Sequence, residues 1–170
     1  MTTRRMRSEG KSSRSGRIVP VLSGAIVWSA CCGALAALAL MQGERQIEAE
    51  ESRLIAVFAG GAALAWLVTA ALAPQLKARL GGRRSLLFLI IASLLALSTI
   101  GVTAALFALD YRSFYARWHA EPLSRIWLLQ LGFTSASAVY QFLVIGLRLY
   151  LPFGPLLLCA AAAMLLRLTR

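Results

Sequence analysis

The chain has 170 residues, 59% of them hydrophobic, and a formal net charge of +11. Several apolar runs of about 20 residues exclude a soluble domain, because a run of this length is what crosses a bilayer. The basic residues lie between these runs, where they set membrane orientation. The sequence has no basic face interleaved with aromatic side chains, so it does not indicate nucleic-acid binding. The composition predicts an all-α, polytopic helical membrane protein whose main partner is the lipid bilayer.

Residues 1–17 are polar and basic, and Glu9 is their single acidic residue. This composition predicts a disordered tail that is held in the cytoplasm. Residues 18–41 form the first predicted span, which is longer than the apolar core of a cleaved signal peptide. Pro20 falls in the first turn of that span, where proline is tolerated. Residues 18–170 are expected to form a single helical membrane domain.

The second predicted span covers residues 54–73 and ends at Pro74, and the third covers residues 85–109. The loop before the second span is rich in Glu and the loop after it is rich in Arg and Lys, which predicts an outer loop followed by an inner one. Small residues recur every four positions on the first two spans: Ser29, Gly33 and Ala37 on the first, and Gly61, Ala65, Thr69 and Ala73 on the second. Two such faces favour a tight antiparallel hairpin.

The third span carries four hydroxyl side chains, namely Ser93, Ser98, Thr99 and Thr103. Hydroxyls of this kind usually bond the carbonyls of their own helix, so we expect no function for them.

Residues 110–121 are predicted to form an interfacial amphipathic helix. Aromatic side chains at helical spacing, together with a neighbouring histidine, give it an outer aromatic belt of Tyr111, Phe114, Tyr115, Trp118 and His119. Such belts anchor proteins at the membrane surface. The same residues are also suited to a recognition surface for a partner protein or a lipid headgroup.

The fourth predicted span, residues 126–147, is the only one with amide side chains inside it. At 100° per residue, one helix face collects Gln130, Thr134, Ser137, Gln141 and Arg148. Amides in hydrocarbon need partners, so this polar stripe is expected to face protein or water. It either bonds neighbouring helices or forms a ligand path or docking face, and Arg148 at its end is suited to anchoring at the headgroups.

The segment Leu151–Pro155 contains two prolines and a glycine and predicts a break after the fourth span. Residues 153–168 then form a short fifth helix. This helix either crosses the membrane or returns to the cytoplasm as part of a re-entrant hairpin, which would keep Arg167 and Arg170 inside.

Catalytic motifs and metal-ligand spacings are absent from the sequence, and no Asp or Glu lies within a predicted span. We therefore expect no enzyme activity and no cofactor. The favoured function is an accessory, assembly or scaffolding subunit of a membrane complex, in a bacterial-type inner (cytoplasmic) membrane with the N-terminus in the cytoplasm. Its partner would be another membrane protein or a second copy of the chain.

Two alternatives remain open. One is a small transporter or channel component that uses the polar stripe of the fourth span. The other is a cofactor-binding or enzymatic protein that acts through His119, with Asp110 and Glu121 nearby.

Overall fold

The computed structural model describes residues 5–42, 49–80, 83–115, 118–144, 146–151 and 153–169. Every regular element in these ranges is helical. The elements are α1 (Arg5–Gln42), α2 (Ala49–Leu80), α3 (Arg84–Tyr115), α4 (Arg125–Val144), the short 3-10 helix η2 (Gly146–Tyr150) and α5 (Gly154–Leu168). The predicted all-α class is confirmed.

Four segments are long and apolar enough to cross a membrane: Ile18–Gln42, Glu51–Leu80, Arg84–Tyr115 and Arg125–Tyr150. The fifth helix, α5, is apolar but has only 15 residues. At 1.5 Å per residue it is about 22 Å long, which is short of a hydrocarbon layer of about 30 Å. The expected set of four long apolar helices and a short fifth is therefore present.

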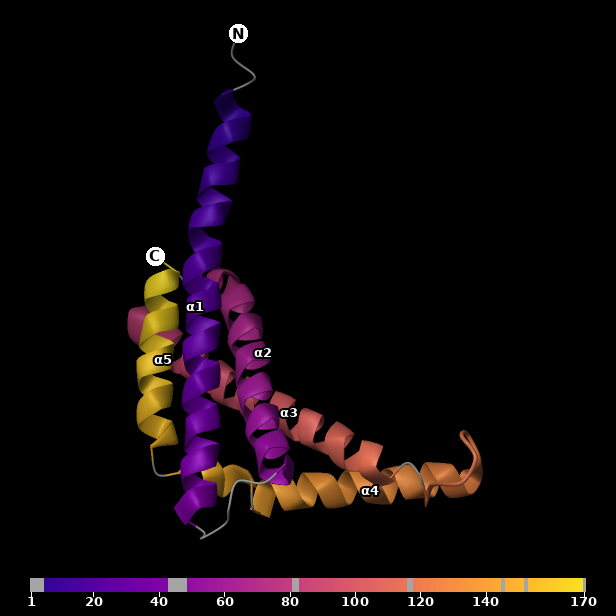
Figure 1. Cartoon of the computed structure of the whole chain (residues 1–170). Helices are drawn as coiled ribbons and strands as arrows, with labels where there is room; N and C mark the ends of the chain where they lie inside the picture. Colours follow the sequence, from indigo (N-terminus) through magenta and orange to yellow (C-terminus); the bar gives the residue numbers. More distant parts are fainter. Residues whose placement is uncertain are drawn as a thin grey trace.

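Figure 1 shows α1 and α5 running antiparallel, α2 packed against α1, and α3 crossing them obliquely. A polar contact marks one end of this bundle. The Lys77 Nζ atom donates a hydrogen bond to the Thr169 carbonyl at 2.7 Å, which joins the last turns of α2 and α5. We call this the Lys77 end, and the opposite end, where α1 finishes, the Gln42 end.

Helix α4 lies across the Gln42 end, transverse to α1 and α5 (Figure 1). Its α-helix stops at Val144 and is followed by η2, so the apolar segment predicted over residues 126–147 changes helix type before its last residues. One residue of α4, Phe142, is buried against Phe58 of α2 and Phe107 of α3, with ring centroids 5.9 and 6.2 Å apart. This contact holds one end of α4 beside the bundle.

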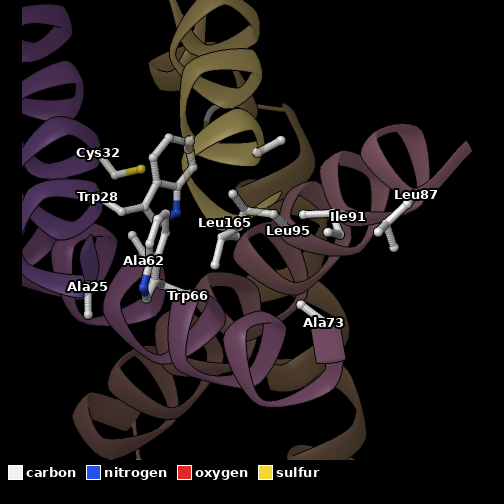
Figure 2. Close-up of a cluster of buried hydrophobic side chains, with 12 residues drawn as sticks. Ala25, Trp28, Cys32, Ala62, Trp66, Ala73, Leu87, Ile91, Leu95 and Leu165 are labelled. Carbon is white, nitrogen blue, oxygen red and sulfur yellow. The ribbon is translucent and has the colours of Figure 1, made fainter. Parts of the chain in front are cut away.

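The core of the bundle is built around two tryptophans, which Figure 2 shows together with Cys32 and Leu165. The indole N–H of Trp66 donates to the Val21 carbonyl at 2.9 Å. The indole N–H of Trp28 donates to Thr99 Oγ1 at 3.2 Å. Both side chains are almost completely buried, so each ring adds apolar contact area while its polar atom stays satisfied.

Two hydroxyls of α3 bond other elements, contrary to our expectation. Thr99 accepts the bond from Trp28, and Thr103 shares a bond of 3.1 Å with the Tyr150 hydroxyl. A tryptophan or tyrosine buried among apolar residues leaves few alternatives for its polar atom, so a threonine on a neighbouring helix becomes its partner.

Small residues bring the helices close, but not all of them in the predicted pairing. On α1, Ser29 Oγ donates to the Ala59 carbonyl at 2.8 Å, and a Cβ placed on Gly33 would lie 3.3 Å from the Ala59 Cβ. The α1–α2 hairpin is therefore tight, as expected. On α2, however, Gly61 faces Thr103 of α3, so its small-residue face serves the α2–α3 contact.

Three predicted helix ends are wrong. Helix α1 extends back to Arg5, although we expected a disordered tail up to residue 17, because adding turns to an existing helix costs far less than starting one. Pro20 consequently lies inside α1 and not in its first turn. Pro74 lies inside α2, since it removes a single backbone donor and strong helix formers follow it up to Leu80.

The predicted interfacial helix over residues 110–121 does not form as a separate element. Asp110 to Tyr115 are the last turns of α3, because neither glycine nor proline interrupts the chain there. Within those turns Ser113 Oγ donates to the Asp110 carbonyl at 2.7 Å.

Candidate functional site at the Gln42 end

The aromatic residues predicted for the outer belt lie together at the end of α3. Ring centroids are 4.7 Å apart for Tyr111 and Tyr115, 5.2 Å for Phe114 and Tyr115, and 5.6 Å for Phe114 and Trp118. Phe107 continues this aromatic cluster toward the core through its contact with Tyr111. Phe114 and Trp118 remain exposed, so the cluster has an open side that is available to lipid or to a partner.

His119, the fifth residue of the predicted belt, has a different role. Its Nε2 atom lies 3.3 Å from Thr134 Oγ1 on α4, within hydrogen-bond distance. This contact connects the predicted belt with the predicted polar stripe. The two groups belong to different predicted helices, and we did not expect them to meet.

Gln130 strengthens the same connection. Its side-chain carbonyl Oε1 accepts a hydrogen bond from the Ala120 backbone N–H at 2.9 Å, while the Thr134 hydroxyl donates to the Gln130 backbone carbonyl. Gln130 and Thr134 thus hold the segment after α3 against the first turns of α4. These bonds run to the preceding loop and within α4, and not to a neighbouring transmembrane helix.

A tight turn and a helix cap complete this junction, and we did not anticipate either. The Ser124 N–H donates to the Glu121 carbonyl at 3.2 Å, and Leu123 in this turn has a left-handed φ of 69°. Ser124 Oγ then accepts a bond from the Trp127 N–H at 3.1 Å and caps α4. The serine three residues before Trp127 was the available sequence signal.

A cation over an aromatic ring fixes α3 and α4 at the same junction. The Arg112 guanidinium carbon lies 5.6 Å from the centre of the Trp127 ring. Such contacts stabilise by roughly 0.5–1 kcal/mol where they are exposed.

Gln141 lies in a cleft of about 420 Å³ between the end of α3 and the start of α2. We call this the end cleft; its polar lining consists of Glu51, Arg53, Asp110, Tyr111, Tyr115 and Gln141. Arg53 Nη2 and Asp110 Oδ1 form an ion pair of 2.6 Å across it. The end cleft thus brings one residue of the predicted stripe together with three of the predicted belt, Tyr111, Phe114 and Tyr115.

The predicted stripe is not a single file of five residues. Gln130 and Thr134 bond the preceding loop, Gln141 lines the end cleft, and Ser137 is exposed. Arg148 is exposed on η2, beyond the end of the α-helix, so the angle computed for it along one continuous helix does not apply.

The face of α4 opposite Ala138 and Phe142 is not covered by any part of the chain that the structure describes. This outward face comprises Leu129, Gly132, Phe133, Ala136 and Tyr140. The Leu129, Phe133 and Tyr140 side chains are 63%, 73% and 67% exposed. A Cβ on Gly132 would meet nothing within 4 Å. The outward face is therefore apolar, with small residues between larger ones.

Among the described residues, no group of three or more His, Cys, Asp or Glu side chains is arranged to hold a metal ion. The chain matches none of the protein families, curated proteins or solved structures with which it was compared.

Proposed function

We propose that the protein is a non-catalytic accessory or scaffolding subunit of a membrane complex, and that α4 docks onto an apolar helix of its partner. The observation that carries this proposal is the poor cover of α4. Only 12% of its most apolar window is buried, against 44%, 33% and 28% for the windows of α1, α2 and α3. Such an apolar surface on one helix is typical of a binding surface.

The position of α4 indicates why lipid alone is a poor cover. A helix that lies transverse at one end of the bundle has hydrocarbon beside it only on the side that faces the bilayer. Its buried residue Phe142 points toward the bundle core, so the outward face points away from it. Apolar side chains on that face would meet the headgroups or water unless a protein covers them.

The shape of the outward face fits a helix. Gly132 and Ala136 are four residues apart, a spacing at which a second backbone can approach closely. Leu129, Phe133 and Tyr140 flank them and supply contact area. We therefore assign this face to an apolar helix of a partner protein.

The charge distribution supports a cytoplasmic N-terminus. The segments attached to the Lys77 end, residues 1–17, 74–84 and 167–170, contain twelve of the eighteen Lys and Arg residues and a single acidic residue, Glu9. The other segments contain equal numbers of basic and acidic residues. By the positive-inside rule, the Lys77 end belongs in the cytoplasm, with the protein in a bacterial-type inner membrane.

A transport function receives less support from the same geometry. A polar path through α4 would need the amides to line one passage. Gln130 bonds Ala120, whereas Gln141 lies in the end cleft. The two amide side chains therefore do not line one common passage.

The experiment is purification of the tagged protein from its own membranes in nanodiscs, at native expression, with the mass of the assembly and its components measured together. The accessory role predicts a stoichiometric partner that is lost from the Gly132→Leu variant. The matched control is Leu97→Ala, which alters a 69% exposed residue of α3 outside the outward face and should keep the partner.

Two results would contradict the proposal. Equal recovery of the partner with both variants would remove α4 from the interface. Recovery of copies of this chain alone would replace the accessory role with a homo-oligomer, the arrangement that favours a transporter.

A further inference from the structure

A second site lies inside the bundle, away from the outward face. A cavity of about 340 Å³ lies between α1, α3, η2 and the start of α5. Its lining includes Trp28, Cys32, Leu35, Ala96, Tyr150 and Leu158. This volume falls within the range of small-ligand sites, and we call the cavity the inner pocket.

The short fifth helix accounts for the inner pocket. Since α5 begins only at Gly154, the space between α1 and α3 nearer the Gln42 end is closed by η2 and the following turn. Leu147, Leu151 and Gly154 from this connection line the pocket. A longer helix at this place would have filled the space with side chains.

Among the described residues, the wall of the inner pocket offers no unpaired side-chain nitrogen or oxygen. Its two aromatic polar atoms are engaged, because the Trp28 N–H bonds Thr99 and the Tyr150 hydroxyl bonds Thr103. No buried side-chain nitrogen or oxygen in the described part of the chain lacks a partner. A polar solute or a water cluster would find no compensation here, so the fitting occupant is a hydrocarbon chain.

The depth of the pocket is that of a bilayer interior. Counted at 1.5 Å per residue from Ile18, Trp28 lies about 15 Å and Leu35 about 26 Å along α1. The lining therefore occupies the middle of the span and the half toward the Gln42 end. Acyl chains of that leaflet are the hydrocarbon available at this depth.

Arg148 supplies a polar end for such a ligand. It lies between Leu147 and Leu151, both of which line the inner pocket, and its side chain is exposed. It forms no ion pair with any described residue. A guanidinium at this place is suited to bidentate bonds with a phosphate at the headgroup level.

We propose that the inner pocket binds one acyl chain of a phospholipid from the leaflet at the Gln42 end, with the lipid phosphate paired to Arg148. The apolar pocket accommodates the acyl chain of the lipid. Arg148 accounts for the preference for a phospholipid over an uncharged lipid. This site is independent of the partner-docking role, since no residue of the outward face takes part in it.

The test uses the full chain in nanodiscs that contain phosphatidylglycerol with a photoreactive group in its acyl chain. After irradiation, labelled residues are mapped by mass spectrometry. Labelling is expected at Leu35 and Leu158. The Ala96→Phe variant fills the pocket and should lower that labelling by about tenfold, equivalent to about 1.4 kcal/mol of affinity. The matched control Leu97→Phe enlarges the neighbouring exposed residue and should leave it unchanged.

Arg148→Gln tests the phosphate. With this variant, pocket labelling by phosphatidylglycerol should fall to the level given by a diacylglycerol with the same chain. Added inorganic phosphate separates the two sources of the anion: lack of competition assigns the phosphate to the lipid, whereas competition would replace the lipid phosphate with a free ion and overturn the proposal. A second pocket-filling variant, Leu158→Trp, and equal unfolding temperatures exclude misfolding as the cause.

Pocket labelling that persists in Ala96→Phe and Leu158→Trp would overturn the proposal. So would equal labelling of the inner pocket and of exposed residues such as Leu97, because that pattern belongs to lipid surrounding the whole protein. Equal labelling of the unaltered protein by diacylglycerol and phosphatidylglycerol would remove the role of Arg148.

Discussion

The side-chain carbonyl of Gln130 accepts a hydrogen bond from the Ala120 N–H at 2.9 Å, and this bond ties the segment after α3 to the first turns of α4. An amide in an apolar helix therefore has its partner ten residues away in the chain. The bond helps to set the direction in which α4 leaves α3.

The first prediction concerns this bond. Gln130→Leu should lower the free energy of unfolding by about 1 kcal/mol, because the Ala120 N–H loses its acceptor. It should also speed tryptic cleavage at Arg125, the first residue of α4. The measurements are thermal unfolding and timed proteolysis in detergent. Ser137→Ala, at an exposed position of the same helix, is the control and should change neither. Unaltered proteolysis in Gln130→Leu would mean that the bond does not hold the segment.

The second prediction concerns Leu123, whose φ of 69° is unfavourable for a residue with a Cβ. Leu123→Gly should raise the free energy of unfolding by about 0.5–1 kcal/mol relative to Leu123→Ala, because glycine adopts this conformation freely. The alanine variant is the matched control, since it removes the same exposed side chain but keeps the strain. Equal unfolding temperatures for the two variants would show that the turn does not store strain.

The third prediction compares two glycines. A Cβ on Gly61 would lie 2.9 Å from the Thr103 Cα, whereas a Cβ on Gly101 would meet nothing within 4 Å. Gly61→Ala should therefore cost about 1–3 kcal/mol of stability through overpacking between α2 and α3. Gly101→Ala should be neutral or stabilising by up to about 1 kcal/mol. Thermal unfolding of both variants measures the difference, and a stable Gly61→Ala protein would contradict the close contact.

Much of the fold was predictable from the sequence, because hydrophobic length and loop charge report directly on membrane helices. The all-α class, the four long apolar helices and the short fifth follow from those features. The direction of α4 could not be predicted in this way. It depends on the packing of Phe142 against Phe58 and Phe107 and on the turn at Leu123. Contacts between residues far apart in the chain leave no local pattern.

For the candidate site, the sequence pattern predicted several of the residues but not the contacts between them. Helical spacing grouped Tyr111, Phe114 and Tyr115, which do lie together. The pairing of His119 with Thr134 joins two separately predicted groups, and nothing in either pattern indicated it. The angle assigned to Arg148 assumed one continuous helix, and the change to η2 after Val144 made that assumption wrong.

The fourth prediction concerns the ion pair of Arg53 and Asp110. Both side chains are substantially exposed, at 58% and 42%, so solvent screens their attraction. A double-mutant cycle of Arg53→Gln and Asp110→Asn should give a coupling energy below about 1 kcal/mol. The coupling should nearly vanish in about 1 M salt, where the Debye length is about 3 Å. A coupling that resists salt would indicate that the end cleft excludes water.

The last prediction concerns the side of the membrane on which the chain ends. If α4 crossed the membrane, the five helices would place the two termini on opposite sides. Because α4 lies across the Gln42 end and Thr169 meets Lys77, we expect both termini in the cytoplasm. Reporters fused before residue 1 and after residue 170 should give the same cytoplasmic signal, and a reporter inserted between α1 and α2 should give the external one. An external C-terminus would show that α4 stands upright in the bilayer, and its outward face would then be covered by lipid and need no partner.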